Sequence, residues 1–75
     1  MSRDVRELVG QNVRRLRKAA ELTQAELAIA MGVDRAYVSG LELGQRNATI
    51  IVLWHVSQAL GVKIGALFEE QKRKT

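Results

Sequence analysis

The side chains of residues 35–47 have the clearest chemistry in this sequence, and that chemistry is hydrogen bonding. The guanidinium of Arg35 can donate two hydrogen bonds to O6 and N7 of a guanine. Tyr37 can stack on a sugar or a thymine methyl group, and Ser39 can bond a phosphate. Catalysis has weaker candidates, because His55 is the single histidine, cysteine is absent and no convincing carboxylate pair lies near His55. We therefore expect a binding protein and not an enzyme, with no metal and no cofactor.

The elements that must position these side chains are indicated by small and apolar residues in the segment 24–43, QAELAIAMGVDRAYVSGLEL. Ala28 is expected where two helices approach closest, and Gly32 where the chain leaves the first helix in a left-handed conformation. Val38, in the second helix, is expected to fill the space where the two helices cross. This spacing predicts a helix-turn-helix. A plain helical hairpin inside a small bundle is the alternative, but three markers in register within a basic chain favour DNA binding.

Capping residues predict the helix boundaries. Thr23 and Glu26 form a capping box, so one helix should begin at residue 24. Asp34 is expected to cap a recognition helix over residues 35–43, which Gly44 ends. The apolar residues expected to face inward are Leu27, Met31, Val33, Val38 and Leu41, and those expected to face outward are Arg35, Ala36, Tyr37, Ser39 and Gly40.

The remaining apolar periodicity predicts an all-α, five-helix domain. A first helix should span residues 4–20, a fourth residues 50–60 between Thr49 and Gly61, and a short fifth residues 64–70. The first of these is expected to bury Val5, Leu8, Val9, Val13, Leu16 and Ala20, and the fourth Ile50, Leu53, Val56 and Leu60.

Length and composition limit the class of protein. A chain of 75 residues has room for one domain, expected to cover residues 1–75 with a core at about 4–70 and a frayed tail. No apolar run approaches the roughly 18 residues of a membrane span, and the N-terminus lacks the apolar core of a signal peptide, so a cytoplasmic protein is expected. The net charge of +4 suits a polyanionic partner. Ribosomal and membrane-surface proteins share that balance.

The order of these elements resembles the Cro and phage-repressor type of helix-turn-helix domain, the XRE family, over residues 9–68. The resemblance rests on TQAELAIAMGV, on VSGLELG and on the later segment QALGV. Within that family, VDRAYVSGLELGQRNATI is similar to the controller proteins of restriction-modification systems. The resemblance implies a transcriptional regulator that binds double-stranded DNA as a homodimer. A phage-type repressor, or an antitoxin with a toxin as its main partner, is the alternative.

The resemblance also implies roles for individual residues. Gln24, at the start of a helix, would hydrogen-bond a DNA phosphate; a solvated first-turn residue is the alternative. The loop after the recognition helix would clamp phosphates through Gln45, Arg46 and Asn47, and its alternative is an ordinary solvated loop. Arg17 and Glu42 would form a partly buried ion pair that fixes the recognition helix.

Two small residues complete the predicted base-reading surface. Ala36 and Gly40 lie one turn apart, so the helix backbone could approach the floor of the groove there and Ala36 could meet a thymine methyl group. Arg35 could instead contact a phosphate, which would add affinity but little specificity. With such short side chains, we expect this protein to depend more on Arg35, the following loop and DNA shape.

Apolar residues beyond the needs of a monomer core predict a dimer. The residues expected at the interface are Ile51, Val52, Trp54, Ile64 and Phe68. The alternative is that Trp54 and Phe68 complete the core of the monomer. A twofold dimer suits a palindromic DNA site. We expect no membrane association and no small-molecule ligand.

Overall fold

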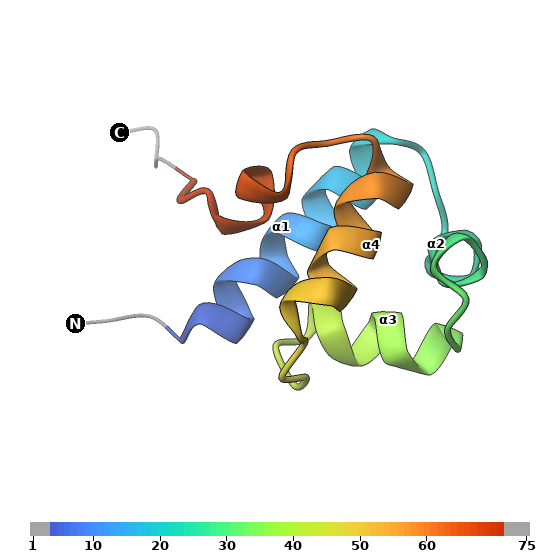
Figure 1. Cartoon of the computed structure of the whole chain (residues 1–75), viewed down its shortest axis with the longest axis horizontal. Helices are drawn as coiled ribbons and strands as arrows, with labels where there is room; N and C mark the ends of the chain where they lie inside the picture. The colour runs from blue at the N-terminus through green and yellow to red at the C-terminus, as the bar shows by residue number, and fades with distance from the viewer. Residues whose placement is uncertain (1–3, 72–75) are drawn as a thin grey trace.

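A computed structural model describes residues 4–71 of the chain (Figure 1). In that range the elements are α1 (Val5–Ala19), α2 (Gln24–Met31), α3 (Arg35–Glu42), α4 (Ile50–Leu60) and a 3-10 helix, η1 (Ile64–Phe68), with no strand. The prediction of an all-helical domain is therefore confirmed. The prediction of five α-helices is wrong in its last member, because residues 64–68 form a 3-10 helix and residues 69–70 lie outside it. Five residues are too few for a stable α-helical segment, and short segments of this kind commonly take the tighter 3-10 form.

The helices surround one apolar core. α1 packs against α3, α4 and η1, while α2 packs against α3 and α4 (Figure 1). Each of the five elements contributes one apolar side chain with no solvent exposure: Val13, Leu27, Val38, Val56 and Leu67. The core thus joins the helix-turn-helix, formed by α2 and α3, to a support made of the other three elements.

The helix ends agree with most of the capping predictions. The Thr23 hydroxyl accepts from the backbone amide of Glu26 at 3.0 Å, and the Glu26 carboxylate accepts from the amide of Thr23 at 2.8 Å. Gly32 follows α2 in a left-handed conformation with a φ of 72°. Asp34 occupies the N-cap position of α3, but its side chain makes no capping hydrogen bond, so that prediction is wrong.

Three residues predicted to be buried are exposed. Val5 and Ile50 are 54% and 72% exposed, because they are the first residues of α1 and α4, at the ends of those helices. Ala20 lies beyond the last residue of α1 and is also exposed. The remaining apolar residues predicted to face inward from α1 and α4 are buried or, in the case of Leu16, packed against the core.

Gly10 sets the distance between α1 and the recognition helix α3. A Cβ atom at this position would lie 2.5 Å from the carbonyl oxygen of Leu41 and 2.6 Å from that of Glu42. Both neighbours are backbone atoms at the C-terminal end of α3, so only glycine permits this approach. None of the helices in the described part of the chain is long and apolar enough to cross a membrane.

Candidate nucleic-acid interface

The outer face of α3 presents the residues that the sequence assigned to it. Arg35 and Ala36 are exposed, and Tyr37, Ser39 and Gly40 are partly exposed. Val38, Leu41 and Glu42 are buried on the opposite side, where they hold α3 against α1 and α2. The helix therefore turns toward solvent a face that carries Arg35 at its start, Tyr37 and otherwise short side chains.

A buried ion pair lies behind this face. The Arg17 Nε atom donates to Glu42 Oε2 at 2.6 Å, and Arg17 Nη2 donates to Glu42 Oε1 at 3.1 Å. Arg17 also donates through Nη1 to the carbonyl oxygen of Leu22 at 2.8 Å. The two charged residues are only 8% and 9% exposed, and the hydrogen bonds from Arg17 to Glu42 raise the pKa of Arg17. The ion pair predicted between Arg17 and Glu42 is thus present. It is bidentate, so the two side chains are held in one relative orientation.

Gln24 links this ion pair to Arg35. Its Nε2 atom donates to Glu42 Oε1 at 3.0 Å, and its Oε1 atom accepts from Arg35 Nη1 at 3.0 Å. The sequence predicts that Gln24 contacts a phosphate. Each end of its amide has a partner within the protein, so the second hydrogen of Nε2 is the donor that is left for such a contact. A chain of four side chains, Arg17, Glu42, Gln24 and Arg35, therefore runs from the core to the first turn of α3.

Arg46 lies along the surface of α3. Its guanidinium carbon is 5.0 Å from the centre of the Tyr37 ring, which is a cation–π distance. A Cβ atom on Gly40 would lie 2.9 Å from Arg46 Nε. The absence of a side chain at Gly40 thus leaves room for the Arg46 side chain, a role that sequence reasoning did not foresee.

The loop after α3 is exposed, and it packs on the first turn of α1. Gln45, Arg46 and Asn47 are all exposed. Gly44, with a φ of 76°, sits on the first turn of α1, where an added Cβ atom would lie 3.1 Å from the Cα and Cγ atoms of Glu7. The donors predicted to clamp phosphates therefore stand on the same side of the molecule as the start of α1.

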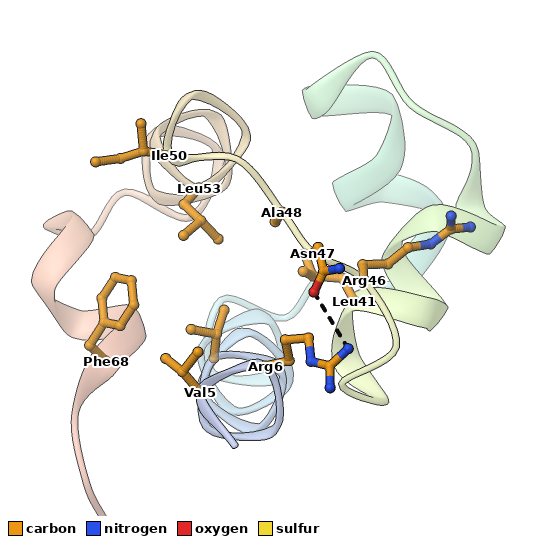
Figure 2. Close-up of a pocket in the computed structure, with 10 residues that line it drawn as sticks. Val5, Arg6, Leu41, Arg46, Asn47, Ala48, Ile50, Leu53 and Phe68 are labelled. Carbon is orange, nitrogen blue, oxygen red and sulfur yellow. Dashed lines mark hydrogen bonds between the residues drawn. The ribbon is translucent and has the colours of Figure 1, made fainter. Parts of the chain in front are cut away.

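The predicted dimer surface divides into two groups. Ile51, Trp54 and Phe68 are 63%, 51% and 41% exposed. Val52 and Ile64 are partly buried and pack against the core. Of these exposed residues, only Phe68 lines an apolar groove of about 350 Å³, together with residues that include Val5, Ile50 and Leu53 (Figure 2).

The described residues contain no group of histidine, cysteine, aspartate and glutamate side chains that could hold a metal ion. His55 is exposed on α4. The exposed Arg35, Gln45, Arg46 and Asn47 lie on α3 and the loop that follows it, and Gln24 at the start of α2 bonds Arg35. That arrangement suits recognition of a surface that offers hydrogen-bond acceptors.

Comparison with protein families identifies the family to which this arrangement of helices belongs. The helix-turn-helix family HTH_3 matches residues 13–67, which include the whole of α2, α3 and α4. The chain belongs to this family. It is thus an XRE-type DNA-binding regulator of transcription, and the helix-turn-helix predicted from Ala28, Gly32 and Val38 is confirmed.

Individual proteins that are similar to this chain agree with the family assignment. An uncharacterised HTH-type transcriptional regulator, y4dJ of Sinorhizobium fredii, is 49% identical over 59 residues, which cover 79% of this chain and 77% of the relative. Control protein C.BamHI of Bacillus amyloliquefaciens is 36% identical over 64 residues, covering 84% and 79%. The crystal structure of the restriction-modification controller protein C.AhdI from Aeromonas hydrophila matches with a TM-score of 0.81 and 40% identity, covering 84% and 91%. This HTH_3 member is therefore similar to controller proteins in both sequence and fold.

Sequence reasoning missed two residues that support this interface from α1. The signal for Gly10 is its place inside an apolar helical pattern, where a glycine often marks a close approach of two backbones. Arg6, at the start of α1, donates through Nη1 to Asn47 Oδ1 at 3.4 Å, and nothing in the local sequence signals that contact.

Proposed function

We propose that this regulator binds a palindromic operator as a homodimer and acts as the controller protein of a restriction-modification system, regulating its own promoter and that of the endonuclease. In this proposal, the residues that face bases are Arg35, Ala36, Tyr37 and Gly40, and those that face phosphates are Gln24, Ser39, Gln45, Arg46 and Asn47. The similarity to controller proteins C.BamHI and C.AhdI supports the choice of regulatory system.

The observation that carries the proposal is the position of Arg35. It lies in the first turn of α3, is exposed, and is held by Gln24, which is itself held by the buried Glu42. The N-terminal turn of a recognition helix is the part that reaches base edges in the major groove. A guanidinium held in place before binding loses less side-chain entropy when it meets a guanine.

The homodimer rests on the exposed apolar residues of α4 and η1. Ile51 and Trp54 on α4 and Phe68 on η1 are large, apolar and exposed, and such patches commonly mark protein interfaces. A twofold dimer places two recognition helices about 34–36 Å apart, one turn of the double helix. The second half-site then binds at a high effective concentration.

The test starts with a palindrome selected by the protein from random duplexes. Binding is titrated onto that palindrome, onto one half-site and onto an unrelated duplex. Arg35→Ala should cost about 1–3 kcal/mol on the palindrome and leave binding to the unrelated duplex nearly unchanged. Arg14→Ala, which removes the same charge from the exposed side of α1, is the matched control and should affect the duplexes alike.

Two outcomes would contradict the proposal. Equal losses on specific and unrelated DNA for Arg35→Ala would make Arg35 a phosphate contact. A half-site bound as tightly as the palindrome would exclude the dimer. The controller role has a separate test: adjacent genes for a methyltransferase and an endonuclease support it, whereas an adjacent toxin gene points to an antitoxin.

A further inference from the structure

Arg6 connects the start of α1 to the loop that follows α3. Its Nε and Nη2 atoms donate to the Asp4 carboxylate at 3.1 and 2.6 Å, and Asp4 also accepts from the backbone amide of Arg6 at 2.9 Å. The Nη1 atom of the same guanidinium donates to Asn47 Oδ1 at 3.4 Å (Figure 2). The guanidinium is thus fixed on one edge by Asp4, and its remaining nitrogen faces the loop.

The loop itself rests on this part of α1. Gly44 stands over the first turn of α1, so close that a Cβ atom would lie 3.1 Å from the Glu7 backbone. This contact places the loop backbone but not the side chain of Asn47, which is exposed. The contact with Arg6 is the interaction that gives the Asn47 amide a direction.

The direction matters because the two ends of an asparagine amide differ. The oxygen only accepts hydrogen bonds and the nitrogen only donates, while the oxygens of a phosphodiester only accept. An asparagine can therefore bind a phosphate only through its nitrogen. Arginine has donors and no acceptor, so Arg6 can hold only the oxygen of Asn47. The nitrogen is then directed away from Arg6.

We propose that Arg6 is a positioning residue of the DNA clamp: it holds Asn47 Oδ1, so that Asn47 Nδ2 faces a backbone phosphate. Asp4 assists by fixing the guanidinium and by neutralising its charge. Arg6 then acts through Asn47 and contributes little attraction to DNA of its own. This inference rests on the proposed function, since it requires that the loop at residues 45–47 meets DNA.

A double-mutant cycle on the full chain tests the inference. The variants Arg6→Ala, Asn47→Ala and the pair are titrated onto the selected palindrome at several salt concentrations. One hydrogen bond to a phosphate corresponds to a loss of roughly two- to tenfold in affinity. Each single variant should show a loss of that size, and the loss of the double variant should be smaller than the sum of the two single losses. Thermal unfolding of each variant establishes that binding is measured on folded protein.

Arg6→Gln separates positioning from charge. Glutamine lacks the positive charge but can donate to Asn47 Oδ1, so it should bind more tightly than Arg6→Ala. Arg14→Ala, a loss of the same charge elsewhere on α1, should lower affinity additively with Asn47→Ala. Additive losses for Arg6→Ala and Asn47→Ala, or equal binding by Arg6→Gln and Arg6→Ala, would overturn the inference.

Failure of the inference can be told from failure of the proposed function. If Asn47→Ala binds like the unmodified chain while Arg46→Ala binds more weakly, the loop clamp stands, Asn47 is not part of it, and the positioning role of Arg6 is wrong. If the unmodified chain selects no palindrome from random duplexes, the proposed function itself fails.

Discussion

The backbone of Gly10 in α1 touches the carbonyl oxygen of Leu41 in α3, so closely that a Cβ atom on residue 10 would lie 2.5 Å from that oxygen. This contact joins the supporting helix to the end of the recognition helix. The Arg17–Glu42 ion pair lies two turns further along α1 and joins the same two helices. The orientation of α3 therefore depends on one close backbone approach and one buried polar link.

Gly10→Ala should destabilise the protein. In an open helix this change would stabilise by about 1 kcal/mol, but here the methyl group meets two carbonyl oxygens that cannot rotate away. Overpacking of this kind typically costs about 1–3 kcal/mol. Urea unfolding measures the change. Gly65→Ala is the matched control, because a Cβ atom there meets nothing within 4 Å. Equal stability of the two variants would contradict the close packing of α1 on α3.

Glu42→Ala should reduce the free energy of unfolding by about 3–5 kcal/mol, because Arg17 would stay buried without its partner. This is a large share of the roughly 4–11 kcal/mol expected for 75 residues at about 0.05–0.15 kcal/mol per residue. Glu42→Gln keeps an acceptor for Arg17 and should lose less. Thermal unfolding of both variants provides the comparison. An unaltered melting temperature for Glu42→Ala would show that the ion pair contributes nothing to stability.

Arg46→Ala should weaken binding to specific and unrelated DNA alike. A phosphate contact by Arg46 displaces about one counterion, so the slope of log affinity against log salt should become shallower by about one unit for each bound subunit. Arg46→Lys keeps the charge and should retain most of the slope. Titration at four or more salt concentrations measures it. A slope that does not change in Arg46→Ala would remove this residue from the phosphate clamp.

Ile51→Glu should yield a folded monomer that binds the palindrome much more weakly. Ile51 is 63% exposed, so the monomer tolerates glutamate there, whereas an apolar dimer interface does not. Sedimentation at micromolar concentration reports the oligomeric state. Ile29→Glu is the matched control, since Ile29 is 80% exposed on α2 and lies outside the predicted interface. Identical sedimentation of the two variants would remove Ile51 from the interface.

Asp4 should titrate at unusually low pH. Hydrogen bonds from the side chain and then the backbone of Arg6 lower the pKa of Asp4 from 3.8 to about 2. A carboxyl group whose pKa is lower in the folded state stabilises that state above its unfolded pKa. This contribution should therefore be complete above about pH 3.8 and lost as the pH falls toward 2. Carboxyl-carbon NMR titration measures the midpoint, which Arg6→Gln should raise. A midpoint near 3.8 in the unmodified chain would exclude the Asp4–Arg6 pair in solution.

Local signals in the sequence were sufficient for the helix-turn-helix. The capping box at Thr23 and Glu26 and the left-handed Gly32 depend on neighbours within a few residues, so their types alone predict where α2 begins and ends. The apolar spacing likewise predicts that Val13, Val38 and Val56 are buried. The same spacing was wrong for Val5 and Ile50, because periodicity does not tell how far the core extends along a helix.

The sequence by itself therefore determined the four α-helices, the turn and the outward face of α3, since these follow from interactions local in the chain. Apart from the Arg17–Glu42 pair, which the family resemblance implied, only the tertiary structure decided which distant residues meet. The contact of Gly10 with Leu41, the bond from Gln24 to Glu42 and the bond from Arg6 to Asn47 each join different elements. Such contacts depend on the angle and distance at which packed helices cross, and residue spacing along one helix carries no information about either.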